Sequence, residues 1–270
     1  MTNQISALVF LLTITLCGFA QEDSVFRYQK EYSGGVSDFA VDNLGNVYLV
    51  YQEGQLKKLK PNGDSIAVFN NVRRFGKLFS IDVSNPLKVL LYYRSFGTVV
   101  ILDRFLNERA VLDLRKQNLL QVRAIGQSYD NNIWLYDELE SKLKKIGDDG
   151  RLIDQSNDLR LVFDSVPSPS IIVDRDKYVY LYDPQKGIYT FDYFGGFKAR
   201  VPLTGWKDFN VINQLVFGRD DKQLYRYEQG TFDLRQLPLP DYMRRAQKVE
   251  VGPGNVYVLK DGIVKVYSYN

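Results

Sequence analysis

The sequence predicts an all-β fold made of repeated small sheets, and three observations support this prediction. A segment rich in valine, tyrosine and leucine recurs six times along the 270 residues. Turn sequences rich in Asp, Asn and Gly separate the predicted strands, and each of the 9 prolines lies in a turn or near a strand end, where no ladder hydrogen bond is lost. The chain is also 45% hydrophobic and 14% aromatic, so it can form a substantial core.

The spacing of the recurring segment predicts how many sheets there are. Successive copies are separated by 36 to 46 residues. This is the length of a propeller blade of four strands. We therefore predict a single six-bladed β-propeller of four-stranded antiparallel blades. The second residues of the six copies are Val47, Val89, Ile133, Val179, Leu215 and Val256.

The clearest repeat covers residues 39–63 and reads FAVDNLGNVYLVYQEGQLKKLKPNG. Its Asp-Asn-Leu-Gly-Asn turn precedes VYLVY, whose β-branched and aromatic residues fit a pleated, half-buried surface. The next strand, LKKL at 56–59, alternates apolar and cationic residues, as does LKKI at 143–146. We expect these lysines to face solvent. Residues 106–121 could also form a helix, but the alternation of their apolar residues favours an outer strand.

The two ends of the chain predict how the ring closes. The last copy supplies strands at 247–251, 256–259 and 263–269 and then lacks a fourth. The segment 25–32, VFRYQKEY, reads as a strand that belongs to no other sheet. We expect it to pair as the outermost strand of the last blade, because this closes the ring and removes the edges of an open array.

The first 20 residues carry no charged side chain and predict an export signal. Residues 5–17 form an apolar run shorter than the roughly 20 residues of a membrane span. Ala20 ends a small-residue sequence typical of a cleavage site. We therefore expect a signal peptide at 1–20, a propeller at 21–270, and no transmembrane segment in the mature chain.

Export without disulfides indicates a bacterial envelope, with the protein in the periplasm or at the outer membrane. Cys17 raises the alternative of a lipid anchor, which is less favoured because Leu16 occupies a position that normally requires a small residue. An uncleaved N-terminal anchor is a further alternative.

Composition excludes several kinds of chemistry. The chain contains no histidine, and its one cysteine is Cys17. Catalysis by Ser–His–Asp or Cys–His groups, imidazole-ligated metals and disulfides within the mature chain are therefore excluded. With 35 Lys and Arg against 32 Asp and Glu, the chain has no polybasic arm for nucleic acid.

Acidic pairs leave carboxylate chemistry open. They could bind calcium or act as acid and base, but all read as turns, where Asp commonly bonds the local backbone. We expect no catalytic residue, no metal and no cofactor. The pairs are Asp148 with Asp149, Asp174 with Asp176, and Asp220 with Asp221.

The repeat resembles the blades of NHL-repeat, YWTD-repeat and TolB-like propellers over about residues 25–270. Residues 42–48, DNLGNVY, match the typical Asp-x-x-Gly-Asn turn and strand well, whereas 130–137 and 253–257 match in part. The resemblance implies the fold, which hosts many unrelated functions. Related lyases, lactonases and quinone-dependent dehydrogenases use a histidine that this chain lacks. Sialidase Asp-boxes and the Gly-His and Trp-Asp pairs of WD repeats are also absent.

In such a ring, the links between blades share one face with the middle-strand turns. The loops predicted for that face carry a positive excess larger than the +3 of the whole chain. Aromatic residues lie among these cations, and Arg with aromatics is typical of interface hot spots. We predict a binding face formed by Arg73, Arg74, Phe75, Arg94, Phe96, Arg115, Trp206, Tyr242, Arg244 and Arg245.

The alternative is a purely structural role, in which the arginines of this face pair with acids of neighbouring loops while its aromatic residues pack inward. The function that we favour is a non-catalytic scaffold or assembly subunit in the cell envelope. It would dock a protein with an acidic surface and is compatible with peripheral association with the outer membrane. The alternative is a carbohydrate binder or a histidine-free, carboxylate-dependent enzyme that uses the axial channel. That alternative requires convergent acids and aromatic rings in a deep axial pocket.

Overall fold

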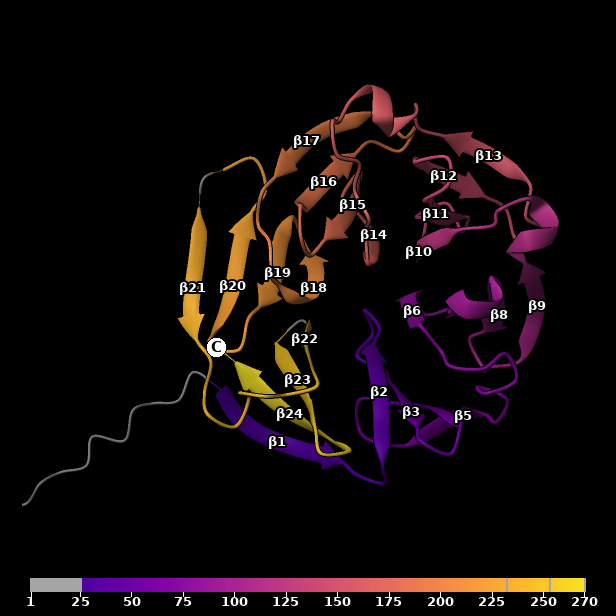
Figure 1. The fold of residues 1–270 in the computed structure, drawn as a ribbon. Helices are drawn as coiled ribbons and strands as arrows, with labels where there is room; N and C mark the ends of the chain where they lie inside the picture. Colours follow the sequence, from indigo (N-terminus) through magenta and orange to yellow (C-terminus); the bar gives the residue numbers. More distant parts are fainter. Residues whose placement is uncertain (1–25, 232, 253, 270) are drawn as a thin grey trace, which may run out of the picture.

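The computed structural model describes residues 26–231, 233–252 and 254–269, and these residues form six antiparallel sheets arranged as a ring (Figure 1). The expected signal peptide at 1–20, including Cys17, lies outside the described residues. The prediction of a six-bladed β-propeller with four strands in each blade is confirmed.

The first five blades follow the chain from the innermost to the outermost strand. Blade 1 consists of β2 (Val36–Val41), β3 (Val47–Tyr51), β4 (Leu56–Leu59) and β5 (Ser65–Phe69). Blade 2 consists of β6 (Ser80–Asn85), β7 (Lys88–Tyr93), β8 (Thr98–Asp103) and β9 (Glu108–Asp113). Blade 3 consists of β10 (Val122–Gln127), β11 (Ile133–Asp137), β12 (Lys142–Ile146) and β13 (Leu152–Gln155).

The next two blades repeat this order. Blade 4 consists of β14 (Ile171–Arg175), β15 (Tyr178–Asp183), β16 (Gly187–Phe191) and β17 (Phe197–Val201). Blade 5 consists of β18 (Lys207–Ile212), β19 (Leu215–Arg219), β20 (Gln223–Glu228) and β21 (Leu234–Pro238). Three short 3₁₀ helices lie in the loops, η1 (Arg94–Phe96), η2 (Leu114–Gln117) and η3 (Leu159–Leu161). The outer strand expected within 106–121 is therefore β9, and the rest of that segment contains η2.

Blade 6 joins the two ends of the chain, as predicted. It consists of β22 (Lys248–Gly252), β23 (Asn255–Lys260), β24 (Ile263–Tyr269) and, outermost, β1 (Phe26–Tyr32). The antiparallel register runs from Phe26 opposite Tyr269 to Tyr32 opposite Val264. In Figure 1, β1 lies along the outside of β24. Each of the other five sheets of the described residues takes its strands from one continuous stretch of chain.

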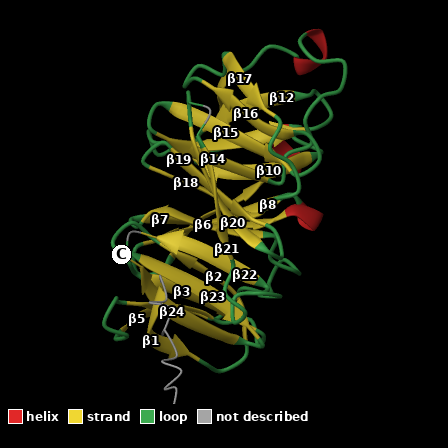
Figure 2. Ribbon diagram, turned by 90° about the vertical axis from the view of Figure 1, so that its left-hand side faces the viewer, coloured by secondary structure: helices red, strands yellow, loops and turns green. Residues whose placement is uncertain are grey.

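Antiparallel pairing sorts the loops into two faces. We call "loop face" the face formed by the links between blades and the turns between the second and third strands. Backbone hydrogen bonds tie each link to the turn of the preceding blade, from Val72 N to Gly54 O (3.2 Å), Leu114 N to Gly97 O (2.8 Å) and Leu159 N to Ser141 O (3.0 Å). Figure 2 shows the short helices together at this side of the ring. The remaining turns form the "opposite face".

The core lies between the blades, and this corrects one expectation. Lys58, Lys144 and Lys145 are only 4–5% exposed rather than solvent-facing. Because neighbouring blades cover both sides of a middle strand, the lysine stems pack inside and the ammonium groups bind polar partners. The Nζ atom of Lys144 lies 2.8 Å from Asp137, and that of Lys145 lies 3.2 Å from Asp130.

Blades 3 and 4 approach so closely that a glycine is required on the innermost strand β10. A Cβ atom added at Gly126 would lie 2.5 Å from the carbonyl oxygen of Ile172, a backbone atom of β14. Gly252 on the innermost strand β22 has more room, since its Cβ would lie 3.5 Å from the nearest atom, on the ring of Tyr257.

We predict that Gly126→Ala lowers the free energy of unfolding by about 1–3 kcal/mol, because the methyl group forces two blade backbones apart. Gly252→Ala is the matched control and should change stability by less than about 1 kcal/mol. Urea denaturation of both variants measures the difference. Equal stability of the two variants would contradict the close approach of blades 3 and 4.

Charged side chains also cross the junction between blades 6 and 1. The Nζ atom of Lys248 lies 3.0 Å from Oδ1 of Asp38 and 3.9 Å from Oε2 of Glu250. Oε1 of Glu250 accepts the backbone N–H of Val41 at 3.0 Å. Burial raises the pKa of Glu250 from 4.5 to about 7, although Lys248 and the Val41 N–H oppose this shift. Between about pH 4.5 and pH 7 the folded protein therefore keeps a proton on Glu250 that the unfolded chain has released.

Protonated Glu250 stabilises the fold fully below about pH 4.5, and this contribution is lost as the pH rises through about 7. We predict that Glu250→Gln, which stays neutral, gains stability relative to the wild type by about 1–3 kcal/mol between pH 5 and pH 8. Denaturation at both pH values measures the gain. A pH-independent difference between the two proteins would show that Glu250 is ionised throughout this range.

Candidate functional site

The structure gathers six of the ten predicted binding residues over blades 1 to 3. Arg73, Arg74 and Phe75 lie in the link between blades 1 and 2, whereas Arg94 and Phe96 lie in η1 at the turn of blade 2. Arg115 lies in η2. The other four residues belong to links on the far side of the ring. We call "basic patch" the exposed cations Arg73, Arg74, Lys77, Arg94, Arg115 and Lys116, together with Phe75, Phe79 and Phe96.

Two glycines allow side chains of the patch to lie flat against the backbone. The ring of Phe96 lies over Gly76, where an added Cβ would be 2.8 Å from Cε2 of the ring. The stem of Arg115 lies over Gly97, and its Nη2 donates to the carbonyl of Ser95 at 2.8 Å. Gly97 ends η1 with φ of 62°, a conformation that glycine adopts readily. The turn of blade 2 therefore contacts both neighbouring links, through Phe96 over Gly76 on one side and through Arg115 over Gly97 on the other.

Aromatic rings support two of the guanidinium groups. Cζ of Arg94 lies 3.9 Å from the ring centre of Phe79, and Cζ of Arg74 lies 4.8 Å from that of Phe75. The ring of Phe75 in turn packs against Tyr93, with centroids 5.6 Å apart. Cation–π contacts of this kind fix the position of a guanidinium group without neutralising its charge.

Most cations of the patch have no acidic partner. Arg74 pairs with Glu108 at 3.0 Å. Within the described part of the chain, the other five cations of the patch form no ion pair, and all five are exposed. Elsewhere on the loop face an arginine does pair with a nearby acid, as the structural alternative predicts, since Arg244 lies 2.8 Å from Asp241. The charge excess predicted for this face is therefore concentrated and unpaired over blades 1 to 3.

Trp206 corrects the predicted site, because it is only 6% exposed and belongs to the core. Its ring stacks on Tyr225 with centroids 5.1 Å apart, and a Cβ at Gly218 would lie 2.3 Å from it. Its backbone N–H donates to the hydroxyl of Tyr182 at 2.6 Å. The small residue opposite this indole lies on another strand, so the sequence around Trp206 did not reveal the space that it fills.

The remaining predicted residues lie between blades 5 and 6, apart from the basic patch. Tyr242 is 36% exposed and stacks on Tyr267 with centroids 4.5 Å apart. Arg245 is exposed with φ of 61°. Lys77, Lys116 and Phe79 belong to the patch but not to the predicted set, and Phe79 is the aromatic residue among them. Its contact with Arg94 arises only from the register of two neighbouring strands, since Phe79 N donates to Tyr92 O at 2.8 Å.

The acids of the innermost strands are already engaged in contacts between blades. Oδ2 of Asp208 accepts from Arg219 Nε at 2.5 Å and from the N–H of Val249 at 2.8 Å. Oδ2 of Asp82 accepts the N–H of Gln127 at 2.7 Å. Among the residues that the structure describes, no group of three or more His, Cys, Asp or Glu could hold a metal ion.

Asp174 differs from its prediction as a turn residue, because it lies within β14 and is 7% exposed. Its Oδ2 accepts from the indole Nε1 of Trp134 at 2.9 Å, the hydroxyl of Ser128 at 3.1 Å and the N–H of Tyr129 at 3.2 Å. Burial raises its pKa above the usual value, although these hydrogen bonds oppose the shift. Asp174 thus links blades 3 and 4.

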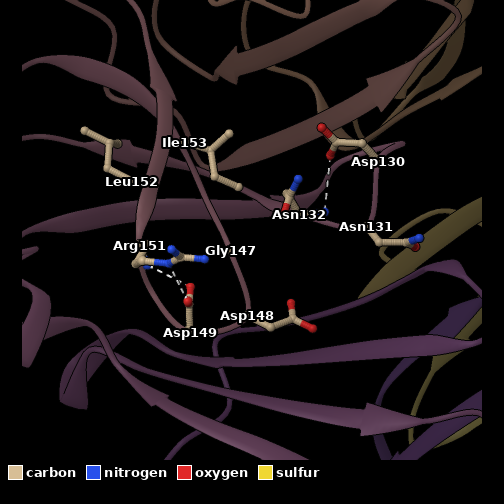
Figure 3. A pocket seen from close by; sticks show the side chains of 9 residues that line it. All are labelled: Asp130, Asn131, Asn132, Gly147, Asp148, Asp149, Arg151, Leu152 and Ile153. Carbon is tan, nitrogen blue, oxygen red and sulfur yellow. Dashed lines mark hydrogen bonds and ion pairs between the residues drawn. The ribbon is translucent and has the colours of Figure 1, made fainter.

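A hollow of about 680 Å³ lies on the opposite face, at the end of blade 3 (Figure 3). Its acidic side chains are paired, Asp130 with Lys145 at 3.2 Å and Asp149 with Arg151 at 2.6 Å. Asp148 forms an ion pair with Lys88. Figure 3 shows the side chains of two turns around the hollow, and each of the three acidic residues among them has a cationic partner in the described structure. No helix of the described residues is long and apolar enough to cross a membrane.

Fold and site together define a six-bladed β-propeller with a basic, aromatic surface over three of its blades. No family model and no curated protein matches the sequence. Among solved structures, the chain is similar to virginiamycin B lyase from Staphylococcus aureus in complex with quinupristin, with a TM-score of 0.59, 11% identity, and coverage of 88% of this chain and 88% of that chain.

Two further solved structures share the architecture. The WD40 domain of Neurospora crassa Pan2 has a TM-score of 0.60 at 8% identity, covering 90% of this chain and 95% of that chain. PorZ of Porphyromonas gingivalis, described as an essential surface component of the type-IX secretion system, has a TM-score of 0.58 at 13% identity. The match covers 87% of this chain and 31% of PorZ. Identities this low show the fold alone.

We predict that Trp206→Ala lowers the free energy of unfolding by about 3–5 kcal/mol, because it empties a core position. Phe96 is 53% exposed, so Phe96→Ala should change stability by less than about 0.5 kcal/mol. Thermal denaturation of both variants compares a buried with an exposed aromatic residue of the predicted site. If Trp206→Ala were as stable as the wild type, the core position of Trp206 would be contradicted.

Proposed function

We propose that this protein is a non-catalytic scaffold that docks a protein with an acidic surface through the basic patch. The observation that carries the proposal is a set of five exposed cations that form no ion pair with any described residue. They are gathered around Phe75 and Phe96 and comprise Arg73, Lys77, Arg94, Arg115 and Lys116. Unpaired like charges repel one another in the free protein. An acidic partner relieves this repulsion.

The chemistry of the patch fits a protein interface. Arginine and aromatic residues are enriched where truncation weakens binding most. The cation–π contacts of Arg74 and Arg94 hold their guanidinium groups in place, which reduces the entropy lost on binding. The closed ring keeps loops of three blades in fixed positions, so they can form one surface.

The proposed location is the cell envelope, with the partner in the periplasm or in an outer-membrane assembly. The uncharged N-terminal 20 residues support export. The similarity in fold to PorZ, a surface component of a secretion system, is compatible with this location. A non-enzymatic role is supported by the absence of histidine and by the paired state of the innermost acids.

A second candidate function is carbohydrate binding on the opposite face, which one observation favours. Tyr129 is 62% exposed and stacks on Tyr193 with centroids 4.1 Å apart. Exposed aromatic rings can stack on a sugar. Tyr129→Ala would abolish retention on a glycan column under this alternative and leave it unchanged under the scaffold proposal.

We predict that the double variant Arg73→Glu/Arg94→Glu loses the partner in affinity purification from envelope fractions. The amount of partner recovered, measured by mass spectrometry, should fall at least about tenfold, because the variant removes the charge complementarity of the interface. The matched control is Arg104→Glu on the opposite face. Arg104 also lies over a phenylalanine, with its Cζ 4.7 Å from the ring centre of Phe105. Full recovery with the double variant, or equal loss with the control, would refute docking through the basic patch.

A further inference from the structure

The loop face continues beyond the basic patch into a sector of opposite charge. The turn of blade 3 carries Glu138 and Glu140, and the link between blades 3 and 4 carries Asp158 and Asp164. Glu140 pairs with Lys144 of β12, and Asp158 pairs with Arg160 of its own loop. Glu138 and Asp164 are exposed and form no ion pair within the described residues. We call these four acids the "acidic sector".

Exposed apolar side chains accompany both sectors. Their exposed fractions range from 49% to 84%, the largest being that of Leu161 in η3. Contiguous apolar groups at loop tips are typical of interaction surfaces. On the loop face from blade 2 to blade 4 these residues are Phe96, Leu120, Leu139, Leu161 and Val162.

Two loops lie on each side of one central link of this face. Among the described residues, the loops on one side carry unpaired cations where those on the other side carry unpaired acids. The link after blade 2, which contains Leu120, stands at the centre. On one side come the turn of blade 2, with Arg94 and Phe96, and the link after blade 1, with Arg73. On the other side come the turn of blade 3, with the acidic Glu138 and the apolar Leu139, and the link after blade 3, with Asp164.

When two such faces meet about a twofold axis, the order of the loops is reversed in the second copy. An axis through the link after blade 2 therefore places Arg94 of one copy opposite Glu138 of the other, and Arg73 opposite Asp164. Phe96 then meets Leu139, and Leu120 meets its own equivalent. Each charged contact occurs twice, as an isologous interface requires.

We propose that the partner docked by the basic patch is a second copy of this chain, bound face to face through its acidic sector. The inference rests on the proposed docking role of the patch and names its partner. It is favoured over an anionic lipid surface because Glu138 and Asp164 lie beside the apolar tips that would have to enter the lipid headgroups, where a uniformly negative surface repels them. A second copy presents acids opposite Arg73 and Arg94, whereas Arg115 and Lys116 of the central link face their own equivalents.

The test is sedimentation velocity of the purified full chain over concentrations up to about 100 µM. The wild type should form dimers that weaken as salt is raised to about 0.5 M, since the contacts are electrostatic. Arg94→Glu and Glu138→Arg should each weaken dimerisation at least about tenfold, because each places like charges opposite one another twice. An equimolar mixture of the two variants should recover dimers, since both contacts regain opposite charges.

Two more variants make the outcome specific. Lys116 lies near the axis and faces its own equivalent, so Lys116→Gln should strengthen dimerisation. Arg104→Glu on the opposite face should leave it unchanged. A chain that stays monomeric, or variants that fail to recover dimers when mixed, would overturn the inference.

The outcomes also separate this inference from the proposed function. A monomeric chain that still loses an acidic partner through Arg73→Glu/Arg94→Glu would refute the second copy and leave the docking role intact. Sedimentation of the monomer with phosphatidylglycerol vesicles would instead identify a lipid surface and overturn the proposal.

Discussion

The antiparallel pairing of β1 with β24 is the interaction on which the rest of the structure depends. Each of the other five blades takes its four strands from one stretch of chain, so only blade 6 joins the first described strand to the last. The register from Phe26 to Tyr32 holds the two ends of the chain together without a disulfide. The junction between blades 6 and 1 is also crossed by the ion pair of Lys248 with Asp38, beside the part-buried Glu250.

Closure of the ring fixes the positions of the loops, so that they can form one surface. A link between blades can present side chains in a constant position only if the blades on both sides of it are fixed. The hydrogen bonds from Val72 to Gly54 and from Leu114 to Gly97 then attach two links to two turns. On this support, Arg94 and Phe96 are held by aromatic and glycine contacts rather than by ion pairs. Rigid loops and unsatisfied charge are both properties expected of a docking surface.

The sequence predicted the architecture well because the information is local. The count of blades follows from segments such as VYLVY and YVYLY, and the closure follows from a strand left over at one end and a strand missing at the other. Six of the nine residues of the patch, from Arg73 to Arg115, were also predicted, since the antiparallel order alone decides which loops share a face.

The errors arose where another strand or another blade covers a side chain. Trp206 fills space above Gly218, on the strand that pairs with β18 in blade 5. Lys58 donates to two carbonyl oxygens of blade 2, whereas Lys144 and Lys145 pair with acids of their own blade. Asp174 accepts from Trp134 of blade 3. A single sequence records the alternation within a strand but not what covers it, so exposure was overestimated at these positions.

Loops of three blades act as one surface if they gain protection together when the partner binds. Hydrogen–deuterium exchange of the protein alone and with its bound partner measures this. Amides of residues 72–77, 94–97 and 114–118 should gain protection together, while turns of the opposite face such as 60–64 and 104–107 should not change. Protection confined to a single blade, or centred on the opposite face, would contradict a surface shared by three blades.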